Sequence, residues 1–472
     1  MRIQFGTSGW RGVIADDFTF NNVKIVSLAI AQHILKNNGK SAIIGYDTRF
    51  LSKDFAKLSA EVLAKNGIKV YFSPEDTPTP VIAYEIIKKQ TDGAINITAS
   101  HNDYYYNGIK FSARTGGPAL PEETKAIEDR INKIINEKIS VEKTPFEEGL
   151  ENKTIEILGR STYLEDIKKL VDFSLIEKRK LKIIYEPFFA TGIRYLPELL
   201  APIANLKIIH GERDPLFGSL HPEPIEKNLT ELINKVRTEN ASIGLSTDGD
   251  ADRFGIIDKG GLYFQPDKIL SIIYYYLITE RKMKGNIVRT VATTQMLDRI
   301  AKHFGFETIE TPVGFKYIGD AVIKGEAIFG GEESGGATIS GWLPEKDGIL
   351  IDSLVTEIIS KKGSTLSKLY KEIASLFGET YSERIDFDYE GDRINIEKKL
   401  KQKISDILKN ERVKKINEID GTKIIFEDDS WLLFRFSGTE NKIRAYCEST
   451  DYKKTENLKI IANKAVQFIK RR

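Results

Sequence analysis

The chain has 472 residues, of which 41% are hydrophobic and 29% charged, and this ordinary globular composition excludes a disordered or fibrous protein. Seventy Lys and Arg against 68 Asp and Glu leave a net charge of +2, so no overall field attracts nucleic acid or an anionic membrane, and an anion site must be local. At about 100 to 200 residues per domain, we expect three or four domains.

The single cysteine, Cys447, excludes a disulfide framework within the chain and a cysteine zinc cluster, and it fits a reducing compartment. No apolar stretch approaches the roughly 20 residues of a membrane span, and the first residues lack the apolar segment of a secretory signal. We therefore expect a cytoplasmic protein with neither a membrane nor nucleic acid as a partner.

The first part of the chain alternates between helical and strand patterns. Helical stretches place apolar residues on one face, and the short apolar runs between them are typical of buried strands. This alternation predicts an α/β domain with a mostly parallel sheet, which we place at residues 1–145. The helical stretches are 23–35, 54–65 and 122–136, and the strand candidates are 42–45, 68–72 and 93–97.

The same alternation returns after a polar stretch, 138–153, that has no period and predicts a linker. It continues to about residue 375, so we expect two further α/β domains, at 146–255 and 256–375. Their strand candidates include 181–185, 206–209, 243–245 and 327–329.

The pattern changes from about residue 380, where apolar runs follow one another closely. Closely spaced strands predict antiparallel pairing, so we expect an α+β domain at 376–472. The predicted fold is therefore α/β, with three mixed-sheet domains and a C-terminal α+β domain. The last strand candidates are 384–389, 424–426, 431–436 and 443–447, and the helical stretches are 394–408 and 453–470.

Small and polar residues, 98–102, follow the strand candidate 93–97 at the edge where open α/β sheets bind ligands. A phosphorylated Ser100 is a phosphoryl donor, while His101 and Lys110 are placed to move protons or to neutralise charge on the transferred group. Taken alone, this short motif is more often a serine helix cap beside a solvated histidine.

Three carboxylates, Asp248, Asp250 and Asp252, occupy every second position after another strand candidate. On one face of an extended segment they repel one another unless a cation lies among them, and hard oxygen ligands select Mg²⁺ or Ca²⁺. The glycine and glutamate of an EF-hand loop are missing, and a solvated acidic turn is the alternative. Arg253 beside the carboxylates favours a phosphate that also contacts the metal.

Two glycine-bearing loops belong to the predicted third domain. In the loop 330–336, Glu332 and Ser334 lie two residues apart and can bind vicinal sugar hydroxyls, although the same composition suits a flexible surface turn. The loop 311–316 ends in Lys316, which can bind a phosphate but alone is more often a solvated surface charge.

Arginines mark two further loops. The first loop, which begins at Arg435, combines guanidinium, hydroxyl and backbone N–H donors that can form a small anion site. A β-hairpin turn fits this sequence as well. The other is a glycine-rich segment near the N-terminus that presents Arg11, which can neutralise a phosphate or stay a surface charge. The residues of the first loop are Arg435, Ser437, Gly438 and Thr439, with Arg444 nearby.

Taken in chain order, four of these loops resemble those of the α-D-phosphohexomutase superfamily. They are T-A-S-H-N at 98–102, D-G-D-A-D-R at 248–253, G-E-E-S-G at 331–335 and R-x-S-G-T-E at 435–440. Four matches in the same order make the resemblance very specific. It implies four domains, each of which contributes one loop to a central cleft.

The resemblance also implies a role for each loop. Ser100 would carry the phosphoryl group, and the metal would be Mg²⁺, held by a phosphoserine oxygen and three aspartates. The implied catalytic residues are Ser100, His101, Lys110 and Arg11, and the implied metal ligands are Ser100, Asp248, Asp250 and Asp252. The implied substrate-binding residues are Arg253, Gly314, Phe315, Lys316, Glu332 and Ser334, and those for the phosphate that does not react are Arg435, Ser437, Gly438, Thr439 and Arg444.

The implied activity is that of a phosphoglucomutase or phosphomannomutase, an intramolecular phosphotransferase. The phosphoserine would donate to a hexose phosphate, and glucose 1,6-bisphosphate would be the intermediate and activator. The G-E-E-S loop resembles the glucose-handling branches, whereas the dual-specificity and glucosamine branches usually end this loop with histidine in place of Gly336. Mannose phosphates stay open as substrates, and we expect a monomer or homodimer.

Two alternatives belong to other classes: a non-catalytic sugar-phosphate-binding relative, and a phosphatase that loses the phosphoryl group to water. The chain departs from the family pattern at Asp103 and Asn441, which stand where many members have proline. Neither change removes a functional group, so we expect catalysis to survive both.

Overall fold

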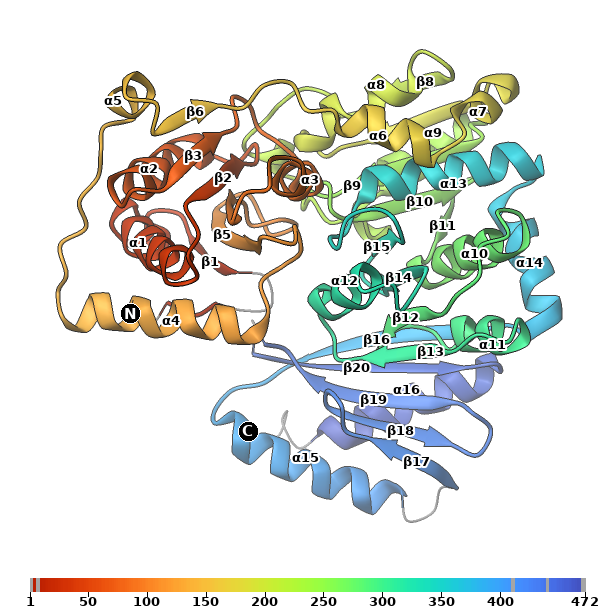
Figure 1. Cartoon of the computed structure of the whole chain (residues 1–472). Helices are drawn as coiled ribbons and strands as arrows, with labels where there is room; N and C mark the ends of the chain where they lie inside the picture. The colour runs from red at the N-terminus through yellow and green to blue at the C-terminus, as the bar shows by residue number, and fades with distance from the viewer. Residues whose placement is uncertain (1–2, 6–8, 409–411, 439–440, 468–472) are drawn as a thin grey trace.

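The computed structural model describes residues 3–5, 9–408, 412–438 and 441–467. Four sheets follow one another along the chain. Figure 1 shows the first domain beside the second and third, with the C-terminal domain below them. This arrangement confirms the predicted fold class, three α/β domains and a C-terminal α+β domain.

The first sheet is mixed, with the strand order β1-β5-β4-β2-β3-β6. Side chains alternate across it, so that Ile44 packs with the cluster under α1 and α2 while Ile43 packs under α3. Its strands are β1 (Trp10–Val13), β2 (Ser41–Tyr46), β3 (Lys69–Phe72), β4 (Gly93–Ile97), β5 (Tyr106–Ala113) and β6 (Ile155–Ile157). Its helices are α1 (Phe20–Lys36), α2 (Ser52–Lys65), α3 (Thr79–Lys89), α4 (Pro121–Asn136) and α5 (Phe146–Glu151).

The second sheet has the order β11-β10-β9-β7-β8, and β10 runs antiparallel to the other four strands. Its strands are β7 (Lys182–Glu186), β8 (Asn205–Ile208), β9 (Ile243–Thr247), β10 (Phe254–Asp258) and β11 (Leu262–Phe264). Its helices are α6 (Tyr163–Leu170), α7 (Phe173–Arg179), α8 (Leu196–Leu200) and α9 (Thr230–Thr238), with short 3-10 turns at Thr191–Arg194, Phe217–Ser219 and Glu226–Asn228.

The third sheet has the order β13-β12-β14-β15 and shares one continuous core with the second. Helix α13 joins them, because it is buried almost all round and contacts β9 and β10 as well as β15. The strands are β12 (Ile287–Thr290), β13 (Thr308–Thr311), β14 (Phe329–Glu332) and β15 (Gly336–Ile339). The helices are α10 (Pro266–Thr279), α11 (Met296–His303), α12 (Phe315–Ile323), α13 (Gly348–Lys362) and α14 (Leu366–Phe377).

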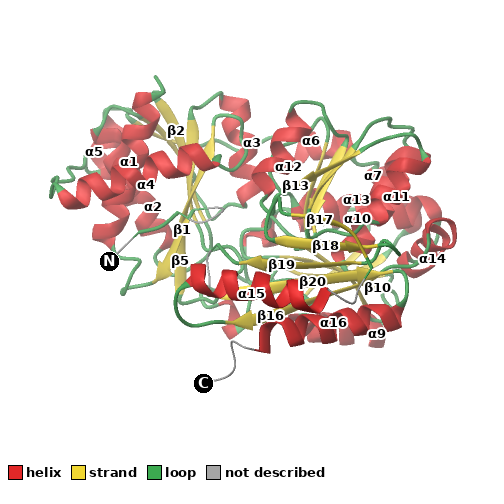
Figure 2. Cartoon of the chain, turned by 90° about the horizontal axis from the view of Figure 1, so that it is seen from below, coloured by secondary structure: helices red, strands yellow, loops and turns green. Residues whose placement is uncertain are grey.

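The C-terminal sheet is fully antiparallel, in the order β16-β20-β19-β18-β17. One face packs against α15 and α16, which Figure 2 shows lying across the sheet. From the other face, Trp431, Leu433 and Tyr446 pack on Val291 and Ala292 of the third domain. The elements are β16 (Tyr381–Asp388), α15 (Arg393–Leu408), β17 (Val413–Asn417), β18 (Thr422–Phe426), β19 (Trp431–Phe436), β20 (Lys442–Ser449) and α16 (Tyr452–Val466).

Two segments lie in different sheets from those implied by the predicted domain limits. Strand β6 pairs with β3 in the first sheet, and α5 lies inside the stretch 138–153 that we expected to be a linker. Strands β10 and β11 continue the second sheet as far as Phe264. The limits at 145 and 255 therefore cut across two sheets, because the sequence pattern does not show which neighbours a short strand chooses.

Candidate active site

Ser100 lies in the loop after β4, buried and with a φ of 51°. A positive φ is uncommon for a residue with a side chain, and such conformations cluster at functional sites. The Ser100 backbone N–H donates to Thr98 Oγ1 at 2.8 Å, and its hydroxyl donates to Asp248 Oδ2 at 2.8 Å. The His101 Nδ1 atom lies 3.3 Å from the same hydroxyl. This serine is held in one orientation and faces the acidic loop of the second domain.

Arg49, which sequence reasoning missed, binds the backbone of the loop that contains Ser100, here called the serine loop. Its side chain is fully buried, pairs with Asp47 at 3.0 Å and lies over the ring of Phe217 from the second domain, 4.8 Å from the centroid. The guanidinium donates to four backbone carbonyls, so a single rigid group fixes the whole loop. The acceptors are the carbonyl oxygens of Ser100 (2.7 Å), Asn102 (2.5 Å), Asp103 (2.6 Å) and Tyr106 (3.1 Å).

The three aspartates occupy the turn between β9 and β10, and all three are fully buried. One oxygen from each lies within 4.8 Å of the others. Burial and the charges of Asp252 and Asp250 raise the pKa of Asp248 well above its ordinary value. Oδ1 of Asp250 and Oδ1 of Asp252 accept no hydrogen bond from the described residues. Unpartnered, buried carboxylate oxygens fit a hard divalent cation such as Mg²⁺.

Two lysines approach these carboxylates from different domains. Lys110 Nζ lies 2.5 Å from Asp250 Oδ2 and 3.0 Å from Asp252 Oδ2, and Lys346 Nζ lies 2.8 Å from Asp252 Oδ2. Burial acts to lower the pKa of Lys110, but the two carboxylates outweigh it and raise that pKa above its ordinary value. Lys110 therefore stays protonated and acts as a fixed positive charge. Sequence reasoning missed Lys346, whose only signal is its place just before α13.

The remaining basic residues of the cluster surround His101. Burial, followed by the charges of Arg253 and Arg11, lowers the pKa of His101 well below its ordinary value. Its imidazole is therefore neutral at pH 7 and able to accept a proton. Arg11 donates to the side-chain oxygen of Asn102, and Arg253 pairs with Glu223 at 3.3 Å.

Residues of the loop 311–316 and of the loop 330–336, here called the sugar loop after its expected role, gather on the third domain's side of the three aspartates. Glu332 Oε1 accepts the backbone N–H of Gly314 at 3.1 Å, and Lys346 Nζ lies 6.0 Å from the ring centroid of Phe315. The hydroxyl of Ser334 donates to Glu332 at 3.5 Å. Burial raises the pKa of Glu332, and the positive charge of Lys346 opposes that rise.

Lys316 has a different environment. It is half-buried, with its pKa lowered by burial, and Glu122 of α4 is the charge that acts on it. It lines a cavity of about 580 Å³ between the first and third domains, together with Arg114 and Arg130. Lys316 therefore lies on the α4 side of this cavity, and among the described residues it forms no ion pair with the three aspartates.

The motif expected to bind the phosphate that does not react, here called the phosphate loop, begins at Arg435, close to the end of β19. Arg435 lies directly opposite Arg444 in the pairing of β19 with β20. Like charges facing each other across two strands destabilise a sheet unless an anion or a carboxylate compensates them. Ser437 and Gly438 follow Arg435 in the chain, while Thr439 lies outside the described residues.

Comparison with known families matches each of the four domains. The matching models describe phosphoglucomutase/phosphomannomutase: α/β/α domain I at residues 2–138, α/β/α domain II at 161–261, α/β/α domain III at 265–377 and the C-terminal domain at 393–461. The chain belongs to the phosphoglucomutase/phosphomannomutase family. Members of this family are isomerases that transfer a phosphoryl group within a sugar phosphate.

Individual relatives of the phosphoglucomutase/phosphomannomutase family carry different substrate names. A phosphoglucomutase of Komagataeibacter xylinus is 30% identical, with 99% of this chain and 91% of the relative covered. A phosphoglucosamine/phosphogalactosamine mutase of Sulfurisphaera tokodaii is also 30% identical, with 96% and 97% covered. The open form of the Paramecium phosphoglucomutase parafusin shares the fold, with a TM-score of 0.83 at 22% identity, over 100% of this chain and 97% of that one.

Within the part of the chain that the structure describes, no other group of three acidic, histidine or cysteine residues is arranged to hold a metal. A search of the described helices also finds none long and apolar enough to cross a bilayer.

Proposed function

We propose that this family member interconverts hexose 1-phosphate and hexose 6-phosphate through a phosphorylated Ser100, with glucose as the preferred sugar. The observation that carries the proposal is the contact between the Ser100 hydroxyl and Asp248, 2.8 Å long, inside a cluster of three buried aspartates. A serine aimed at a cation site is arranged to carry a phosphoryl group rather than to cap a helix.

Asp248, Asp250 and Asp252, with an oxygen of phosphorylated Ser100, would hold Mg²⁺. A magnesium ion bound there supplies positive charge against the negative charge of the transferred phosphoryl group. Lys110 adds a second fixed positive charge at the same place.

The transfer needs a group that takes a proton from the attacking hydroxyl. His101 is neutral at pH 7 and lies beside Ser100, whereas Lys110 stays protonated, so His101 is our candidate base. The sugar hydroxyl gives its proton to His101 as its oxygen bonds to phosphorus, and the bond from phosphorus to Ser100 Oγ breaks. The resulting 1,6-bisphosphate must turn over, after which Ser100 Oγ takes the other phosphoryl group by the reverse steps.

The choice of sugar rests on the loop that contains Glu332 and Gly336. A side chain at position 336 would begin 2.3 Å from Lys346 Cδ, so a histidine there would displace the lysine that pairs with Asp252. This favours the glucose-handling branches and agrees with the name of the Komagataeibacter relative. Amino-sugar and mannose phosphates are the second candidates, because the Sulfurisphaera relative is named for amino sugars and the family includes phosphomannomutases.

The test is a coupled mutase assay with glucose 1-phosphate, Mg²⁺ and a trace of glucose 1,6-bisphosphate, beside mannose 1-phosphate and glucosamine 1-phosphate. We expect turnover of glucose 1-phosphate that ceases with EDTA and in the Ser100→Ala variant. Release of inorganic phosphate without an isomer would instead identify a phosphatase. No isomerisation of any of the three, from protein that carries phosphate on Ser100, would contradict the proposal.

A further inference from the structure

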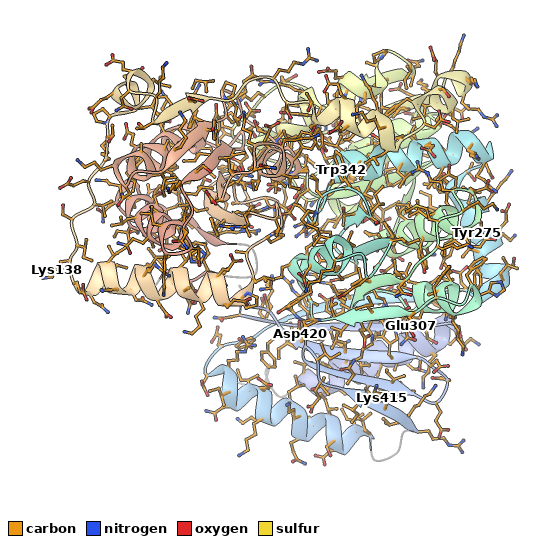
Figure 3. The ribbon with its side chains drawn as sticks, in the orientation of Figure 1. Lys138, Tyr275, Glu307, Trp342, Lys415 and Asp420 are labelled. Carbon is orange, nitrogen blue, oxygen red and sulfur yellow. The ribbon has the colours of Figure 1, made fainter. Side chains whose placement is uncertain are left out.

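Asp420 lies in the turn between β17 and β18, where the C-terminal domain meets the third domain, and Figure 3 labels it at this junction. One oxygen, Oδ2, accepts two hydrogen bonds from two different ligand-binding loops. The first comes from Arg435 Nε at 2.6 Å, and the second from the backbone N–H of Val313 at 3.0 Å. Asp420 is therefore shared between the phosphate loop and the loop 311–316.

The turn is built to bring this carboxylate close to Arg435. Gly421, next in the chain, has a φ of 88°, and a Cβ on it would lie 2.2 Å from the carbonyl oxygen of Phe434. Only glycine allows the turn to lie so tightly against β19. The backbone thus fixes the position of Asp420 relative to the end of β19, where Arg435 begins the phosphate loop.

The contacts continue from Asp420 to the sugar loop. Val313 and Gly314 are successive residues whose backbone N–H groups are held by carboxylates from two sides. Val313 donates to Asp420 of the C-terminal domain, and Gly314 donates to Glu332 of the third domain. The dipeptide Val313–Gly314 therefore links Glu332, which is proposed to bind the sugar, through Asp420 to Arg435, which is proposed to bind the phosphate.

The planar geometry of the guanidinium lets Asp420 set the direction in which Arg435 presents its other N–H donors. An arginine offers five N–H donors in a rigid plane, and Asp420 takes only the one at Nε. Among the described residues, none accepts a hydrogen bond from the Nη atoms of Arg435. These are the donors that a phosphate would bind, in a direction set by Asp420. The side chain of Arg435 is 10% exposed, and such a buried cation needs this partner when no phosphate is bound.

We infer that Asp420 is a positioning residue that aims the guanidinium of Arg435 at the phosphate that does not react and couples this phosphate site to the loop 311–316. The inference rests on the proposed function. Asp420 bonds to Val313 and Arg435, and among the described residues not to Ser100 or the three aspartates, so it would act on how well the sugar phosphate binds rather than on the chemical step.

The test uses the full chain with Asp420→Ala and a matched control, Asn417→Ala. Asn417 is the last residue of β17, just before this turn, and also bonds to the third domain, through Glu310 at 2.6 Å, but it does not contact Arg435. We expect Asp420→Ala to raise the KM for the sugar phosphate about tenfold, with kcat changed less than about threefold. Asn417→Ala should leave both within about twofold.

A double-mutant cycle separates positioning from simple docking of the two domains. In an Arg435→Gln background, Asp420→Ala should change KM less than about twofold, because the group it orients is gone. The conservative variant Asp420→Asn, which keeps an oxygen acceptor, should recover part of the lost affinity. An equal loss in both backgrounds, or the same loss with Asn417→Ala, would overturn the inference.

Binding measured without turnover distinguishes failure of this inference from failure of the proposed function. In Ser100→Ala protein, calorimetry should show that Asp420→Ala weakens binding of glucose 6-phosphate about tenfold. Unchanged affinity would overturn the role of Asp420 and leave the mutase proposal standing. If Asp420→Ala weakens binding but the unsubstituted protein isomerises no sugar phosphate, the role of Asp420 is supported and the mutase proposal is contradicted. Absence of glucose 6-phosphate binding in the Ser100→Ala parent would overturn both.

Discussion

Ser100 and Gly249 touch across the boundary between the first two domains. A Cβ on Gly249 would lie 2.4 Å from the carbonyl oxygen of Ser100, which is closer than any real Cβ contact. The same approach brings the Ser100 hydroxyl to Asp248. The glycine in the motif D-G-D-A-D-R is therefore required by the neighbouring serine loop.

Gly249→Ala should separate the two loops. The added methyl group meets a backbone carbonyl that Arg49 holds in place, so a shift of Ser100 relative to the aspartates is the only relief. Because a misplacement of about 1 Å costs about 100-fold in rate, we expect kcat to fall by about that factor. Gly159→Ala is the matched control, since nothing lies within 4 Å of a Cβ there. Equal activity of Gly249→Ala and Gly159→Ala would contradict the claim that the contact between Gly249 and Ser100 positions the serine.

Removal of the divalent metal should abolish activity, and Asp248→Asn should weaken metal binding. Asparagine keeps an oxygen acceptor for the Ser100 hydroxyl but replaces one of the three clustered carboxyl groups with a neutral amide, which binds a cation more weakly. We expect the Mg²⁺ concentration for half-maximal activity to rise at least about tenfold. Magnesium titrations after treatment with EDTA measure this directly. Full activity of the protein in excess EDTA would exclude a metal role for the aspartates.

Arg49→Lys should lower kcat about 100-fold and leave KM within about threefold, because an ammonium group cannot bridge four carbonyls of the serine loop. Asp103→Pro is the control in the same loop. It restores the residue typical of the family, keeps the carbonyl that Arg49 binds and removes two partly exposed side-chain contacts, the pair with His221 and the hydrogen bond from the Tyr105 hydroxyl. Its activity should stay within about twofold, and a larger loss would show that these contacts also position Ser100.

The pH dependence of kcat/KM should report His101. A base whose pKa is lowered by burial and by Arg253 loses its proton as the pH rises through that lowered pKa. Activity should therefore rise with pH along an acid limb below the ordinary histidine pKa and be level at neutral pH. In His101→Gln this limb should disappear from the pH profile and the plateau should fall about 100-fold. If the acid limb of the pH profile is unchanged in His101→Gln, the limb reports the titration of another group.

Asp352 should destabilise the protein at neutral pH. It is fully buried on α13, and neither carboxyl oxygen accepts a hydrogen bond from the described residues. Burial, with Asp347, raises its pKa well above 3.8, so the folded protein binds this proton more tightly than the unfolded chain does. Stability therefore falls as the pH rises from the unfolded pKa towards the folded one.

Asp352→Leu should remove this penalty. We expect its melting temperature to exceed that of the unsubstituted protein by at least about 2 °C at pH 7. The gain should shrink as the pH falls towards and below the unfolded aspartate pKa of 3.8, because the unfolded chain then binds this proton as well. Asp352→Asn serves as a second variant, because it removes the titration but keeps an unpartnered polar group. A gain that does not depend on pH would contradict a charge-based origin.

The sequence predicted the fold class and the family, and it indicated the loops of the candidate site, because all of these depend on local patterns. Alternating helical and strand periods identified three α/β domains, and the spacing of Asp248, Asp250 and Asp252 indicated a cation site before any contact was known. The segment 138–157 was interpreted less well. Its apolar positions are too few to show that α5 and β6 belong to the first sheet.

The sequence by itself therefore determined which loops are candidates for the site, since those loops contain their polar and charged groups within a few residues of one another. Only the tertiary structure decided which groups support them. Arg49, Lys346 and Asp420 act on loops that lie 50 residues away or come from other domains, and a solitary charged residue carries no local signal of its partner. The physical reason is that burial of such a charge is favourable only where the folded backbone places an acceptor or an opposite charge beside it.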